Sequence, residues 1–129
     1  CIEAYASGTS IARRAARLRR GSRLDAAALF KMSRMGARDA LRLVQETYEY
    51  LGLWLGNIVN LLDPEIIVLV GGVTNWGPPL FRALRRLTPK YSINPNASKI
   101  PIVPARLGRD VGVFGAVAAL LEKNLNREM

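Results

Sequence analysis

The sequence has no histidine and only one cysteine, Cys1, among its 129 residues. A single thiol excludes an intrachain disulfide framework and is typical of a reducing compartment. Without histidine, the chain alone cannot form a zinc site, a Cys–His pair or a Ser–His catalytic pair. Because the first residue is not methionine, we expect this chain to be part of a longer protein.

Long apolar segments are missing as well. Polar residues interrupt the richest apolar stretch at Asn57, Asn60, Asp63 and Glu65, so no run reaches the roughly 18 residues that a membrane span needs. The N-terminus lacks the basic and then apolar pattern of a secretory signal. We therefore expect a cytoplasmic protein with no membrane partner.

Acidic residues are scarce, since ten Asp and Glu stand against 19 Lys and Arg and leave a net charge of +9. The arginines gather in the segments 13–23, 82–86 and 106–109. A basic surface attracts nucleic acid, phosphorylated ligands or acidic proteins. We favour solvated or paired arginines, as in some thermophiles, because no aromatic residues interleave with the clusters as base-stacking platforms.

Binding of nucleic acid stays an alternative, and it would weaken steeply with salt. The residues that would carry it are Arg13, Arg14, Arg17, Arg19 and Arg20.

Apolar periodicity predicts a helix-rich chain with two short strands. The predicted order is helices over 11–20, 26–35 and 37–62, a strand over 65–70, a helix over 78–87, a strand over 100–105 and a helix over 111–125. Ser7 or Thr9 would cap the first of these helices and Asp110 the last. Gly112 and Gly115 would be tolerated in the last helix only if another backbone or a ligand comes close.

The strand predicted over 65–70 is an uninterrupted β-branched run, which is typical of a parallel strand covered on both faces. Pro101 and Pro104 place the second strand at an edge, because proline cannot donate a ladder hydrogen bond. Two strands alone make a marginal sheet. We therefore expect an α/β fold whose remaining strands lie upstream or in another copy of the chain.

Two positions are candidates for ligand binding. Gly71-Gly72 follows the buried strand, where glycine lets the backbone approach a ring or a phosphate, although a tight turn explains it equally well. Glu3 is either a carboxylate at a helix start, stabilised by the helix dipole, or an acceptor for a ligand hydroxyl. The local pattern does not choose between these roles.

Polar residues also gather at the end of the long helix, at Asn57, Asn60 and Asp63. For these we favour hydrogen bonds to neighbouring backbone over ligand binding, because Asn and Asp commonly satisfy the groups left open at helix ends and turns.

Three blocks, CIEAYASG, YLGLWLGNIVNLLDPEIIVLVGGV and IPIVPARLGRDVGVFGAVAAL, resemble successive parts of the C-terminal region of the ROK family. That family comprises bacterial-type sugar kinases such as glucokinases, related N-acetylmannosamine kinases and sugar-responsive repressors. The resemblance implies the C-terminal portion of an actin-like (ribonuclease H-like) ATPase fold, helix-rich with a small, mainly parallel sheet. Residues 1–129 would then form a C-terminal lobe fragment, with the N-terminal lobe outside this sequence.

The same resemblance implies roles for individual residues. Glu3 would bind a sugar hydroxyl, and Gly71, Gly72 and Val73 would lie against the adenosine of ATP. Cys1 would be the last cysteine of the family's Cys-Gly-Cys-Gly-x-x-Gly-Cys-x-Glu segment, which holds a structural zinc that this chain cannot complete alone.

The sequence departs from the family's pattern at two positions of the second block. Val70 stands where the family often has a first glycine of three. Trp54 stands where glycine is often found, and its ring would either fill space near the nucleotide or crowd it.

The resemblance implies a hexokinase or glucokinase-type enzyme that uses ATP with Mg²⁺ to phosphorylate a hexose, and that is a homo-oligomer. No residue of this chain would be catalytic, because the family's phosphate loop and general base lie upstream, and phosphoryl transfer needs both together with a metal. This chain alone is therefore expected to be inactive. The alternative is the sugar-sensing domain of a ROK transcriptional repressor, which would add a nucleic-acid partner.

Overall fold

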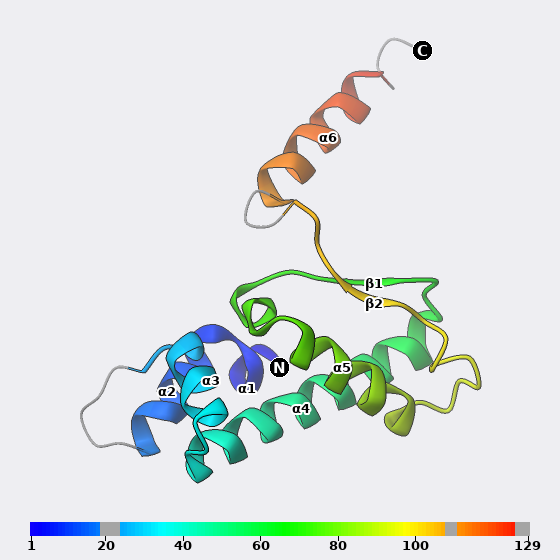
Figure 1. The fold of residues 1–129 in the computed structure, drawn as a ribbon. Coiled ribbons are helices and arrows are strands. Elements are labelled where there is room, and N and C mark those ends of the chain that lie inside the picture. Colours follow the sequence, from blue (N-terminus) through cyan, green and yellow to red (C-terminus); the bar gives the residue numbers. More distant parts are fainter. Residues whose placement is uncertain (19–23, 108–110, 126–129) are drawn as a thin grey trace.

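Helix α4 (Arg38–Leu62) is the longest element, and most of the other elements pack along it (Figure 1). The computed structural model describes residues 1–18, 24–107 and 111–125. In chain order the elements are α1 (Glu3–Ala6), α2 (Gly8–Leu18), α3 (Ala26–Arg34), α4, β1 (Ile67–Leu69), η1 (Gly72–Trp76), α5 (Pro78–Leu87), η2 (Thr88–Tyr91), β2 (Ile102–Pro104) and α6 (Val111–Leu125), where η marks a 3-10 helix. The predicted order of helices and strands is confirmed, with α1, η1 and η2 as short additions.

Side-chain caps and one proline fix the helix ends. Ser7 Oγ accepts a hydrogen bond from the Ser10 amide at 3.1 Å, so Ser7 is the cap of α2. Asp25 Oδ1 caps α3 by accepting from the Ala28 amide at 2.7 Å. Helix α4 ends at Asp63, which adopts the left-handed conformation (φ 42°) before Pro64. The predicted cap Asp110 lies outside the described residues.

Strands β1 and β2 pair in parallel, with Ile67 opposite Ile102 and Leu69 opposite Pro104, as the sequence predicts. The described chain does not cover the first strand on both faces, so this part of the prediction stays a prediction. Ile67 is buried, whereas Ile66, Val68 and Val70 are each more than half exposed. The physical reason is that the described elements cover one face of the two strands and leave the other open.

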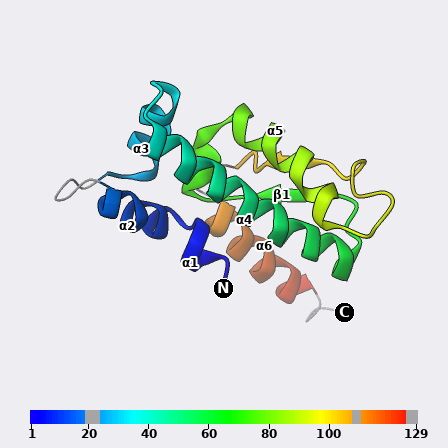
Figure 2. The same ribbon diagram turned by 90° about the horizontal axis from the view of Figure 1, so that it is seen from below.

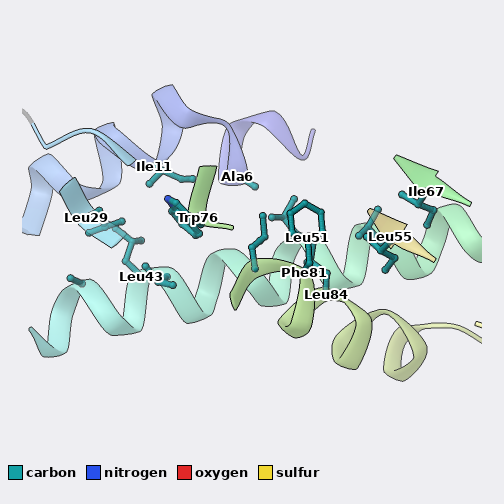
Figure 3. Close-up of a cluster of buried hydrophobic side chains, with 14 of the residues drawn as sticks. Ala6, Ile11, Leu29, Leu43, Leu51, Leu55, Ile67, Trp76, Phe81 and Leu84 are labelled. Atoms are coloured by element: carbon teal, nitrogen blue, oxygen red, sulfur yellow. The ribbon is translucent and has the colours of Figure 1, made fainter. Parts of the chain in front are cut away.

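The core runs along the apolar stripe of α4 (Figure 3). At one end, Leu43 meets Leu29 of α3 and Ile11 of α2. The other end brings Leu55 close to Ile67 of β1. Between them, α5 contributes apolar side chains of its own, so a single core joins the first helices to the strands.

Trp76 closes this core near α3. Its ring stacks on Phe30 with centroids 5.3 Å apart and an interplanar angle of 8°, and it meets Tyr48 edge-on at 5.8 Å. The indole N–H donates to the Ala26 carbonyl at 2.9 Å. Burial raises the pKa of Tyr48, and the nearby Arg82 partly offsets that rise. This cluster fixes η1 against α3.

Two arginines of the basic segments are used inside the fold. Arg14 forms an ion pair with Glu46 at 2.6 Å, donates to the Tyr5 carbonyl and lies over the Tyr50 ring. Arg85 donates to the Ile102 carbonyl of β2 at 2.8 Å. Arg14 and Arg85 are therefore paired within the fold, whereas Arg19 and Arg20 lie outside the described residues, so the choice between paired arginines and nucleic-acid binding stays a prediction.

The end of α4 organises the loop that follows η2. Asn60 Oδ1 accepts from the Ile93 amide at 2.9 Å and from the Ser92 hydroxyl at 2.6 Å. Asp63 accepts from the Asn94 amide group at 2.5 Å. The predicted hydrogen bonding to backbone is therefore confirmed for Asn60, whereas Asp63 binds a side chain and the role of Asn57 stays a prediction.

At two positions one helical turn apart, Gly52 and Gly56, α4 comes close to the segment formed by α5 and η2. A Cβ placed on Gly52 would lie 2.6 Å from Leu87 Cβ. At Gly56 it would lie 2.7 Å from Tyr91 Cβ and 2.9 Å from the Tyr91 carbonyl carbon and oxygen. On the other side of this contact, the Tyr91 hydroxyl donates to Glu49 at 2.6 Å, which raises the pKa of Tyr91. Both glycines are therefore packing requirements.

Helix α6 extends away from the rest of the described chain (Figure 1; Figure 2 gives the view from below). Every residue from 112 to 120 is exposed, including Val113 and Phe114. In the described chain a Cβ on Gly112 or Gly115 would meet nothing within 4 Å, so the close neighbour expected for these glycines stays a prediction. Among the described helices, none is long and apolar enough to cross a membrane.

Replacing Gly56 by alanine should destabilise the 129-residue chain by about 1–3 kcal/mol, since the new methyl group overlaps backbone atoms of Tyr91. Gly115→Ala is the matched control. It adds the same methyl group to an exposed helix position, so it should leave stability unchanged or raise it by up to about 1 kcal/mol. Urea unfolding followed by circular dichroism measures the free energy of unfolding of both variants. Equal changes in the two variants would show that helix propensity alone determines the effect.

Replacing Thr88 by valine should stabilise the chain. The Thr88 hydroxyl oxygen is fully buried and finds no hydrogen-bond partner in the described part of the chain, so the isosteric apolar side chain removes a desolvation cost of about 1 kcal/mol. Thr47 is equally buried, but its hydroxyl donates to the Leu43 carbonyl at 2.8 Å. The midpoint temperature of thermal unfolding should therefore be lower for Thr47→Val than for Thr88→Val. The reverse order would contradict this explanation.

Candidate functional site

A cavity of about 490 Å³ opens between α1, the middle of α4 and the carboxyl end of β1. Its size is that of a small-molecule site. All four residues predicted to bind ligands line it, namely Glu3, Gly71, Gly72 and Val73. The structure thus brings together two segments that lie nearly 70 residues apart in the sequence.

Glu3 lies in the first turn of α1 and is exposed. Helix α1 is held in place by Ala6, which is buried, and by the Tyr5 ring, which lies 4.8 Å from the Tyr50 ring of α4. Glu3 is therefore fixed at the cavity by a short helix whose inner face packs on α4. Among the residues that the structure describes, its carboxylate is the only charged side chain that lines the cavity.

The glycine turn is another part of the lining, at the carboxyl end of a parallel strand, where α/β folds place their ligands. Gly71 has φ 122° and ψ 173°, a conformation that is essentially restricted to glycine. Thr74 closes the turn, since its amide and its hydroxyl both donate to the Gly71 carbonyl, at 3.1 and 2.7 Å. These two hydrogen bonds hold the turn closed.

Gly72 differs from Gly71. It is not one of the glycines with positive φ, and a Cβ placed on it would meet no atom within 4 Å. Neither backbone conformation nor packing within the described chain requires glycine here. The missing side chain leaves open space beside the cavity, as close approach of a ligand to the backbone would require.

Cys1 is an exposed, free thiol. Within residues 1–18, 24–107 and 111–125, no group of three or more His, Cys, Asp or Glu side chains gathers in a way that could hold a metal ion. The residues present therefore do not fit a zinc ion, and we assign no role that depends on one.

Two further wall residues come from α4, where Leu51 and Trp54 face the cavity. Neither was predicted from the sequence to be a site residue. Trp54 is a large side chain at a position where the family often has glycine, and in the structure it lines the cavity with 37% of its surface exposed.

A second cavity, of about 500 Å³, lies on the other side of α4 and is lined by charged side chains of both signs, among them Arg42, Glu49 and Arg86. It contains none of the residues predicted to bind ligands, and no strand end opens into it. We therefore place the functional site at the first cavity.

Alanine substitutions should separate the two glycines of the turn. Gly71→Ala forces a strained backbone conformation and should cost about 1–3 kcal/mol of folding stability. Gly72→Ala should change stability by less than about 0.5 kcal/mol, because its methyl group enters open space. Chemical denaturation measures the free energy of unfolding of the two variants. A large loss of stability for Gly72→Ala would refute the claim that packing does not require glycine at position 72.

Comparison with known proteins gives consistent matches over nearly the whole chain. The model of the ROK family matches residues 1–123. The N-acetyl-D-glucosamine kinase of Pasteurella multocida is 31% identical over 124 residues, which cover 95% of this chain and 40% of that protein. The glucokinase of Thermotoga maritima is 28% identical over 139 residues and covers 95% of this chain and 43% of the enzyme.

The fold is also found among solved structures. The ROK hexokinase from Thermus thermophilus superposes with a TM-score of 0.78 at 33% identity, over 90% of this chain and 38% of that one. The chain thus has the C-terminal part of the actin-like ATPase fold, as the sequence predicts. It spans about two-fifths of the length of the curated relatives described above.

Proposed function

The chain belongs to the ROK family, and we propose that it is the C-terminal part of a sugar kinase that transfers the γ-phosphoryl group of ATP, bound with Mg²⁺, to a hexose. The observation that carries this proposal is the single cavity lined by Glu3 and by the turn Gly71–Val73. A sugar hydroxyl and a nucleotide must lie in one site for in-line transfer. Such a cavity supplies a contact for each of them.

In this proposal the chain binds and positions, and does not itself perform the chemistry. Glu3 accepts a hydrogen bond from a hexose hydroxyl, and its carboxylate makes that bond stronger than a neutral acceptor would. The backbone at Gly71, Gly72 and Val73 lies against the adenosine. The general base and the phosphate loop belong to the part of the protein outside this sequence.

The names of the similar proteins support the kinase over the repressor. Relatives that match 95% of the chain are kinases of N-acetyl-D-glucosamine and of glucose. We therefore propose glucose and N-acetyl-D-glucosamine as the first hexoses to test. An oligomeric, cytoplasmic enzyme is part of the same proposal.

The test is formation of ADP by the full-length protein with each hexose, compared with its Glu3→Gln variant. Loss of a hydrogen bond to a charged acceptor is worth about 1.5–3 kcal/mol, so kcat/KM for the hexose should fall roughly 10- to 100-fold while KM for ATP stays within about twofold. Glu65→Gln, the same change at an exposed carboxylate outside the cavity, is the matched control. Unchanged hexose kinetics in Glu3→Gln would refute the role of Glu3, and no ADP formation with any hexose would refute the kinase.

A further inference from the structure

Trp54 is a large aromatic side chain on the wall of the candidate cavity, and 37% of its surface is exposed. The other tryptophan, Trp76, is only 2% exposed, stacks on Phe30 and donates its indole N–H to the Ala26 carbonyl. In the part of the chain that the structure describes, Trp54 has neither a ring partner nor a hydrogen bond for its indole N–H. A tryptophan left exposed at a cavity is available to pack against a ligand.

Apolar side chains make up much of the cavity lining. Trp54 lines the cavity together with Leu51 of α4 and with Val68 and Val70 of the strand segment. Leu51, Val68 and Val70 offer no hydrogen bonds to the hydroxyl groups of a sugar, and none of the four side chains offers a positive charge to a phosphate. They suit a flat, uncharged part of a ligand, which gains most from apolar contact and stacking.

The glycine turn leaves space for such a ring. Gly71 and Gly72 line the same cavity as Trp54, and a Cβ on either would point into open space. An aromatic face and a stretch of backbone without side chains, in one cavity of about 490 Å³, together fit a planar heterocycle. Aromatic side chains stack on nucleic-acid bases in this way in many proteins.

We propose that Trp54 is the stacking platform for the purine base of the nucleotide donor and so sets the affinity for that donor. The inference rests on the proposed function, because it places the nucleotide at the glycine turn. It assigns Trp54 to the base alone, whereas the hexose lies at Glu3 and the triphosphate lies away from this apolar wall.

The test measures binding to the full-length protein by isothermal titration calorimetry. ADP, adenosine, tripolyphosphate and the hexose are titrated as separate ligands. Base stacking contributes about 1–3 kcal/mol per base on alanine substitution, so Trp54→Leu should raise Kd for ADP and for adenosine roughly tenfold. Kd for tripolyphosphate and for the hexose should stay within about twofold. Trp54→Phe, which keeps an aromatic face, should recover most of the lost affinity.

Leu53→Ala is the control, since Leu53 is the exposed neighbour of Trp54 on α4 and does not line the cavity. It should leave all of these dissociation constants unchanged. If Trp54→Leu does not fold, Trp54→Phe still decides the question through fluorescence. Adenosine should quench the tryptophan emission of the wild type, and this quench should be absent in Trp54→Phe.

Three outcomes would overturn the inference: equal shifts for adenosine and tripolyphosphate, a rise in Kd for the hexose instead, or no change with any ligand. Failure of the proposed function is distinguishable from these. A protein that forms no ADP with any hexose, yet loses adenosine affinity in Trp54→Leu, would retain the base platform and refute only phosphoryl transfer to a sugar.

Discussion

The close contact of α4 with the segment formed by α5 and η2 is the constraint on which the rest of the structure depends. Gly52 and Gly56 let two backbones approach to distances at which a Cβ would overlap Leu87 and Tyr91. This approach sets where α5 lies, and β2 follows α5 because Arg85 holds the Ile102 carbonyl. Since β2 pairs with β1, the position of the glycine turn at the end of β1 is determined by a contact on the far side of the core.

The candidate site combines this rigid scaffold with short, local elements. Helix α4 supplies the wall and anchors α1 through Tyr50, while β1 supplies the turn. Glu3 and Gly71 are thus positioned by the same helix from two directions. Such an arrangement fixes the distance between a polar contact and a glycine turn without any direct bond between them, which is what a site for two reactants requires.

Much of this could be predicted from the sequence. Periodicity predicts the long helix and its end at Asp63-Pro64, and the β-branched run predicts a parallel strand, because both depend on local spacing.

The exposed face of β1 could not be predicted from this chain. The run Ile66–Val70 records the burial of a strand with neighbours on both faces, whereas the described chain covers only one. Helix α6 shows the same discrepancy, since its apolar residues and its two glycines suit neighbours that the described body does not provide. Single residues that face a cavity, such as Trp54, need the three-dimensional arrangement before they can be distinguished from core residues.

The exposure of α6 has a thermodynamic consequence. A helix of 15 residues without a packing partner is marginal in water, because its hydrogen bonds barely offset the conformational entropy lost by ordering the backbone. In this chain α6 gains little from the core, so its helical state and its burial are linked equilibria. A surface that covers Val113, Phe114 and Val117 would therefore also supply free energy that keeps α6 folded.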